Sequence, residues 1–176
     1  MSELSRWSSF YDVVGSAAGA LIGLQFVVIT LLATRPPPRA ATQGGAAAFS
    51  TPNIVHFSAV LLIAVLVHVP WGSIVPFAVL AGLTGTAGFV YAFVTARRMR
   101  AQSAYEPDME DWLFYALLPL ASFLVLTLAA VALEPFEHAA LFALGTVTLL
   151  LLFGAIHNAW DAASYHVLFA RQNQDK

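Results

Sequence analysis

The residues that could most readily do chemistry are His157 and Asp161, four positions apart in a stretch that the sequence predicts to be helical. Positions i and i+4 share a helix face, so the carboxylate could accept an imidazole N–H and raise the histidine pKa toward physiological pH. Together with Asn158, and with His56 expected at the same depth on another helix, they form a candidate gating or proton/ion site. A hydrogen-bonded pair that only anchors its helix at the membrane interface is the alternative.

A second polar group is expected at the opposite ends of the helices. It consists of His68, Glu134, Glu137 and His138, and it is a candidate outer-mouth polar group. Because the chain has no cysteine, a metal would need histidine and carboxylate ligands of this kind. No metal-binding motif such as HExxH is present, so the sequence predicts no metal site.

Haem would require histidines at matching depths on two helices. His56 and His68 are 12 residues apart, about 18 Å along a helix, whereas His138 and His157 are 19 residues apart, about 28 Å. Two stacked haems need similar separations, so the sequence predicts no cofactor. A single haem held by one histidine pair remains compatible with these distances.

Composition identifies the elements that must position these residues. The chain of 176 residues is 59% hydrophobic and 10% charged, whereas a soluble domain carries about 25% charged residues. This predicts an all-α polytopic membrane protein. Five apolar stretches predict a single transmembrane bundle with spans at about 13–34, 52–69, 74–96, 112–133 and 136–158, the last continuing as a helix to about residue 169.

Short turns and long loops give the predicted helices a direction. Proline-containing turns near residues 70 and 135 predict that the second and third spans, and the fourth and fifth, are antiparallel hairpins. Five spans then place both long loops and the C-terminus on one side, with seven of the eight basic residues. These are Arg35, Arg39, Arg97, Arg98, Arg100, Arg171 and Lys176, whereas Arg6 lies on the other side. The positive-inside rule predicts an external N-terminus and a cytoplasmic C-terminus, in a bacterial-type inner membrane.

Two helical features predict packing. The second helix is expected to begin at Thr51-Pro52, with proline in its first turn. The first span contains Gly15, Gly19 and Gly23, a GxxxGxxxG run that places three glycines on one face for close helix approach. This face predicts self-association, with contacts inside one chain as the alternative. In the fourth span, Pro119 lacks an amide hydrogen, which frees the carbonyl of Tyr115 and predicts a kink.

The functional hypotheses depend on absent enzyme motifs, on the charge balance and on the polar residues of the predicted helices. It contains no GxSxG, P-loop or dinucleotide fingerprint, so no enzyme activity and no catalytic residue are predicted. Eight basic against ten acidic residues exclude a nucleic-acid partner. The first hypothesis is a homo-oligomeric channel or transport protein with a polar stripe on the fifth helix. The others are a non-catalytic accessory subunit of a larger membrane complex and a haem-binding redox protein.

Overall fold

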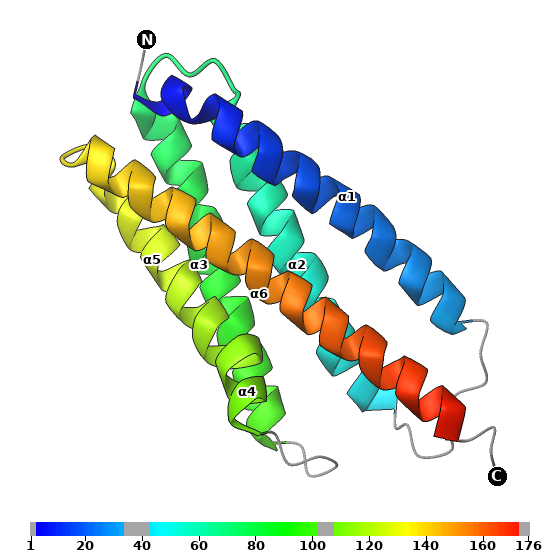
Figure 1. Cartoon of the computed structure of the whole chain (residues 1–176). Coiled ribbons are helices and arrows are strands. Elements are labelled where there is room, and N and C mark those ends of the chain that lie inside the picture. Colours follow the sequence, from blue (N-terminus) through cyan, green and yellow to red (C-terminus); the bar gives the residue numbers. More distant parts are fainter. Residues whose placement is uncertain (1–2, 34–42, 102–107, 173–176) are drawn as a thin grey trace.

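A computed structural model describes residues 3–33, 43–101 and 108–172 of the chain, and the side chains of residues 3–31, 52–101 and 108–164. All regular secondary structure in these residues is helical (Figure 1). The helices are α1 (Ser8–Ala33), preceded by the short 3-10 turn η1 (Leu4–Trp7), then α2 (Gln43–Val67), α3 (Ile74–Ala101), α4 (Met109–Asp111), the π-helical turn η2 (Trp112–Leu117), α5 (Leu118–Ala132) and α6 (Glu137–Gln172).

Four stretches among the described residues are long and apolar enough to cross a membrane. They are Leu4–Leu31, Ile74–Ala101, Met109–Ala132 and Glu137–Ser164, and Pro52–Val67 is a shorter apolar helix. The all-helical class is therefore confirmed. The last helix, α6, runs from Glu137 to Gln172. Length and composition identify four candidate membrane-spanning helices in the part of the chain that the structure describes, so the expected count of five is not confirmed.

The expected start of the second helix at Thr51-Pro52 is wrong. Helix α2 begins at Gln43 and carries Pro52 in its interior. Proline removes only its own amide donor, and a helix interior can tolerate this where neighbouring groups satisfy the freed carbonyl. The Gly/Ala-rich residues before Pro52 therefore extend α2 instead of forming part of a loop.

The helices form two antiparallel hairpins, α2/α3 and α5/α6, whose turns lie at the same end of the bundle (Figure 1). We call this the turn end, and the opposite end, where α1 and α3 terminate, the loop end. Helix α3 packs against α5, and α6 packs against both α2 and α5. Helix α1 lies on the outside of the bundle, mainly against α2, with a smaller contact to α6.

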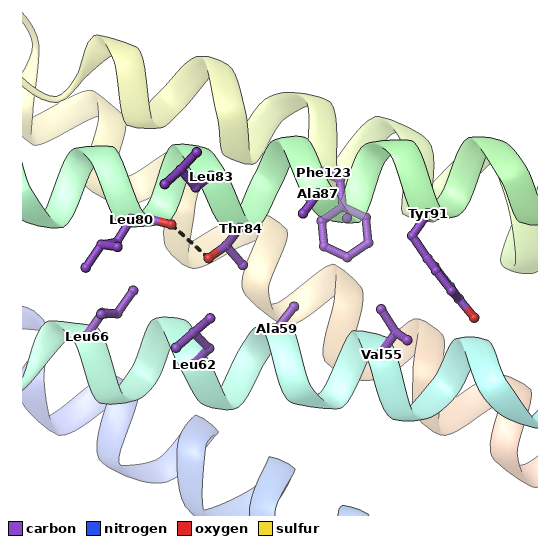
Figure 2. Close-up of a pocket in the computed structure, with 11 residues that line it drawn as sticks. Val55, Ala59, Leu62, Leu66, Leu80, Leu83, Thr84, Ala87, Tyr91 and Phe123 are labelled. Carbon is purple, nitrogen blue, oxygen red and sulfur yellow. Dashed lines mark hydrogen bonds between the residues drawn. The ribbon is translucent and has the colours of Figure 1, made fainter.

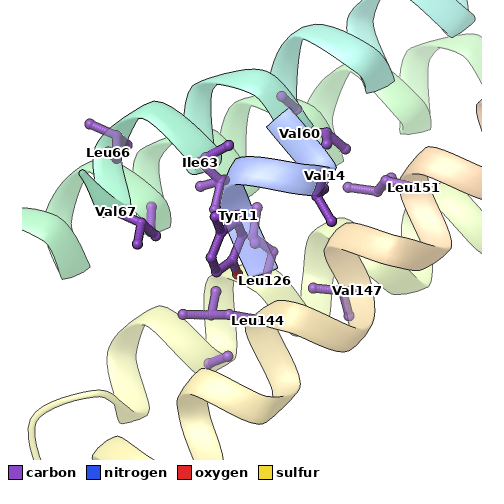
Figure 3. Packing of buried hydrophobic residues seen from close by; sticks show 14 of the residues in the cluster. Tyr11, Val14, Val60, Ile63, Leu66, Val67, Leu126, Leu144, Val147 and Leu151 are labelled. Atoms are coloured by element: carbon purple, nitrogen blue, oxygen red, sulfur yellow. The ribbon is translucent and has the colours of Figure 1, made fainter. Parts of the chain in front are cut away.

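The centre of the bundle is filled by large apolar side chains. Phe57, Phe77 and Phe123 are at most 1% exposed, and Tyr11 from α1 inserts among aliphatic residues of α2, α5 and α6 (Figure 3). In a bilayer, packing of this kind replaces lipid contacts with closer protein contacts, because no hydrophobic effect drives the helices together. A few polar side chains are buried in the bundle as well, namely Asn53, His56, Ser122, Thr148 and Asn158.

The glycines that bring two helices closest together lie on α3, not on α1. A Cβ added at Gly85 would lie 2.8 Å from the backbone nitrogen of Thr127, and one added at Gly88 would overlap the ring of Phe123. Both glycines are therefore required for the approach of α3 to α5. Sequence analysis assigned a packing role only to the glycines of the first span.

The predicted glycine face of α1 is used only in part within the chain. A Cβ at Gly15 would lie 2.7 Å from the Cβ of Ala64 on α2, so this glycine makes an intramolecular contact. At Gly19 and Gly23, no described atom lies within 4 Å of the position that a Cβ would take. The helix diverges from the bundle at this point, and its later side chains, such as Leu24 and Phe26, are about 60% exposed.

Candidate functional site

Two of the four residues predicted as an outer-mouth group, His68 and His138, form separate pairs with carboxylates that were not in that group. The Nε2 atom of His68 lies 2.8 Å from a carboxylate oxygen of Asp12, and the Nδ1 atom of His138 lies 2.9 Å from a carboxylate oxygen of Glu3. Glu134 and Glu137 form no ion pair with a described side chain, so the structure does not bring the four residues together as one group. Asp12 lies in α1 and Glu3 directly precedes η1, so the two pairs hold these elements against the neighbouring hairpins.

Acidification is expected to weaken the second of these pairs. The hydrogen bond from His138 holds the pKa of Glu3 below its ordinary value of 4.5, with a smaller contribution from Arg6. A carboxyl whose pKa is lowered in the folded state stabilises that state above pH 4.5, and this contribution is lost as the pH falls through the lowered pKa. A titration followed by NMR should therefore show Glu3 protonating below 4.5 in the native protein. In the His138→Gln variant the midpoint should move back toward 4.5, and an unchanged midpoint would contradict the pairing.

A small acidic pocket lies at the loop end, between α6 and the segment that leads into α5. Its volume is about 90 Å³, and its lining is Asp108, Glu110, Asp111, Tyr115, His157 and Asp161. Two of these, His157 and Asp161, are residues that the sequence places on one face of the last helix, and the structure brings both to the same pocket. We call this site the acidic pocket.

The partner of His157 differs from the one expected. Its Nε2 atom lies 3.3 Å from a carboxylate oxygen of Glu110, and its ring stacks on Phe114 with a centroid separation of 3.8 Å. No hydrogen bond links His157 to Asp161 among the described residues. Because Phe114 holds the imidazole plane, the ring is directed toward the segment before α5 rather than along its own helix.

Local sequence explains how Glu110 reaches this position. The side chain of Asp108 accepts a hydrogen bond from the Asp111 amide, and the side chain of Asp111 accepts one from the Asp108 amide. This capping box satisfies two amide donors at the start of the short helix α4. Glu110 lies between the two capping residues, in the same helical turn, and extends toward α6.

A π-helical turn joins the acidic pocket to the core. In η2 the amide of Leu118 bonds to the carbonyl of Leu113, five residues back. If the same bonding between residues five apart continued by one residue, the carbonyl of Phe114 would accept a hydrogen bond from the amide of residue 119. Pro119 has no amide hydrogen, and the Nδ2 of Asn158 donates to that carbonyl instead, at 3.2 Å. The helix is thus irregular directly before Pro119, and the carbonyl that Asn158 satisfies belongs to Phe114 rather than to Tyr115.

Asn158 and Tyr115 thus lock α6 to η2. The hydroxyl of Tyr115 donates to the backbone carbonyl of Asn158 at 3.3 Å, and Asn158 is completely buried. A proline inside a helix leaves one carbonyl without a backbone donor, which is costly in an apolar environment. A buried side-chain amide that donates to this carbonyl removes that cost. Asn158 is accordingly a structural neighbour of the acidic pocket and does not line it.

His56 lies away from the acidic pocket, inside the helical bundle. It is 2% exposed, and its ring centroid lies 5.8 Å from that of Phe123. Asn53, one turn earlier on α2, is fully buried, and neither of its amide atoms has a described partner. The structure therefore does not bring His56 together with His157 and Asp161. His56 lies inside the bundle, whereas the other two residues line the acidic pocket at the loop end.

The described histidines lie in four different surroundings, three beside carboxylates and one beside Phe123. Within the described part of the chain, no three His, Asp or Glu side chains come close enough to hold a metal ion. The acidic pocket consequently offers four carboxyl groups and one imidazole ring, but among the described residues no ready set of metal ligands.

Tyr115, Glu110 and Asp108 belong to the site, and sequence reasoning did not select them. Glu110 and Asp108 lie in a loop-like acidic stretch that has no fixed spacing from His157, so only the fold brings them together. The one signal available was Pro119, which marks an irregular helix near Tyr115.

No protein-family model matches the chain, and comparisons with curated proteins and with solved structures give no significant match. What the fold defines by itself is a small, all-helical protein with four candidate membrane-spanning helices. Its functional assignment therefore rests on the packing of α1 and on the acidic pocket.

Proposed function

We propose that this chain is a non-catalytic membrane subunit that functions by helix–helix association through α1. The observation that carries the proposal is the second half of α1, which leaves its own bundle with Gly19 and Gly23 uncovered by any described residue. A glycine face permits close backbone approach between membrane helices, and of the three glycines on the α1 face only Gly15 makes such a contact with a described residue. A second copy of α1 would supply the same face in a symmetric pair.

The proposal includes five membrane crossings. Helix α2 has 25 residues, about 37 Å of helix, although its strongly apolar part covers only Pro52–Val67. Helix α1 begins at the turn end and α6 finishes at the loop end, which is what an odd number of crossings requires. The distribution of arginine and lysine then favours a plasma-membrane protein with a cytoplasmic loop end and an external turn end.

Native mass spectrometry of the protein in a mild detergent tests the association. We expect a dimer or higher oligomer for the wild type, and at least tenfold weaker association, about 1.4 kcal/mol, for Gly23→Leu. Val131→Leu is the matched control, because Val131 lies on α5 and is 75% exposed. An oligomer unchanged by Gly23→Leu would place the interface elsewhere, and a wild-type monomer in native-membrane extracts as well would remove the proposal.

A homo-oligomeric channel or transport protein is the second candidate, and the acidic pocket is the observation that favours it. Four carboxylates at the loop end could concentrate cations at the mouth of a pore on a symmetry axis. Among the described residues, the centre of one chain is packed mainly with apolar side chains, so the proposed path would lie between several subunits. Cation flux into vesicles should then fall in Asp161→Asn with the oligomer intact, and equal flux would remove the pocket from this mechanism.

A further inference from the structure

An apolar groove runs along the outside of the bundle between α2 and α3 (Figure 2). It has a volume of about 560 Å³. Leu62 and Ala59 of α2 face Leu80 and Thr84 of α3 across it, and the ring of Phe123 from α5 closes its floor. The α2–α3 contact is looser than the α3–α5 contact, which leaves this groove open to the side.

The groove is apolar even where its lining carries a hydroxyl. Thr84 donates its hydroxyl to the carbonyl of Leu80 at 2.8 Å, in the turn before it on the same helix. This bond satisfies the polar group locally, as Ser and Thr commonly do in membrane helices, and the surface that remains is hydrocarbon. The natural occupant of such a groove is a hydrocarbon chain.

The groove lies in the middle of α3 and is about as long as half of the bilayer core. On α3 it runs from Leu80 to Tyr91, 11 residue steps or about 16 Å of helix, and the bilayer core is about 30 Å thick. The last residue of α3, Ala101, is 10 residue steps or about 15 Å beyond Tyr91, so an acyl chain of the leaflet on that side can reach into the groove.

Positively charged arginines lie on α3 beyond the Tyr91 end of the groove. Tyr91, Thr95 and Arg98 continue the groove face of α3 at helical spacings of four and three residues. Arg97, Arg98 and Arg100 are exposed at this end of α3, and none of the three forms an ion pair with a described side chain. A second copy packed in parallel would bring its own arginines to the same place, which like-charge repulsion disfavours.

We propose that the α2–α3 groove binds an anionic phospholipid, with one acyl chain in the groove and its phosphate at Arg98. The apolar lining supplies affinity for the chain, and the arginine supplies preference for the headgroup. The inference does not depend on the association through α1, because the groove lies on α2 and α3.

Native mass spectrometry with added lipids tests this proposal. The probes are phosphatidylglycerol and phosphatidylcholine with identical acyl chains, each added to delipidated protein in mild detergent. We expect one phosphatidylglycerol to be retained per chain with about fivefold preference over phosphatidylcholine, the effect of roughly one arginine near a charged headgroup. Equal retention of the two lipids would overturn the headgroup assignment.

Two variants separate the contributions of the groove and the charge. Ala87→Phe fills the groove from an exposed position and should abolish retention of both lipids, while Arg98→Gln should keep binding and lose only the preference. Val131→Phe, on the exposed surface of α5, is the matched control and should bind as the wild type does. If Ala87→Phe does not fold, Leu83→Trp fills the same groove. Retention unchanged in a folded groove-filling variant, or a second protein copy found in place of lipid, would overturn the proposal.

Discussion

Gly85→Ala is expected to destabilise the protein by about 2–3 kcal/mol, near the upper end of the cost of overpacking a close-packed core. The new Cβ would meet the backbone nitrogen of Thr127 at 2.8 Å and the carbonyl oxygen of Phe123 at 3.1 Å. Backbone atoms cannot rotate away, so α3 and α5 would have to separate along this contact. Thermal unfolding in detergent, followed by circular dichroism, measures the loss.

Gly82→Ala is the matched control for that prediction. It makes the same substitution on the same helix one turn earlier, where the added Cβ would lie 3.5 Å from the Cβ of Ala130, an ordinary contact. Its stability should stay close to that of the wild type or increase slightly, because alanine also favours the helix. Equal losses in the two variants would mean that general helix perturbation, rather than the α3–α5 approach, determines the effect.

Asn158→Leu is expected to cost about 1–2 kcal/mol, the range for leaving one buried carbonyl without a donor in a membrane protein. The substitution removes the Nδ2 donor that bonds to the carbonyl of Phe114. The loss should depend on Pro119, because that proline is the reason the carbonyl has no amide partner of its own. Chemical unfolding in detergent or in bicelles measures both single variants and their combination.

Combining Pro119→Ala with Asn158→Leu tests whether the cost of losing Asn158 arises from the proline. Pro119→Ala restores an amide hydrogen beside the Phe114 carbonyl, so Asn158→Leu should cost much less in that background than in the wild type. The difference between the two costs is the coupling energy of the pair. Strictly additive effects would contradict the account of the π-helical turn.

The helices were predictable because apolar runs of this length have few alternative structures. The span expected at 74–96 extends as a helix to Ala101, and the last helix, expected to continue to about residue 169, ends at Gln172. The start of α2 was mispredicted since proline is a strong helix-start signal, and the residues before it look like a linker by composition. Gly85 and Gly88 were missed because spacing alone does not show which glycine face meets another helix.

The candidate site was predictable only within single helices. His157 and Asp161 reach the same pocket since their spacing fixes them on one face of α6. Glu110 and His157, or Glu3 and His138, come together through tertiary packing across long separations in sequence, which periodicity cannot reveal.

The most direct test of assembly through α1 is cysteine cross-linking in native membranes. Because the chain contains no cysteine, Gly23→Cys introduces a single thiol in α1, and Val131→Cys introduces a comparison thiol on the exposed face of α5. We expect a short bifunctional reagent to link Gly23→Cys efficiently to a second copy of the chain, and to link Val131→Cys only weakly. A cross-link from position 23 to a different membrane protein would support the accessory form of the same function. Absence of any α1-specific cross-link, with the protein folded and the thiol reactive, would contradict it.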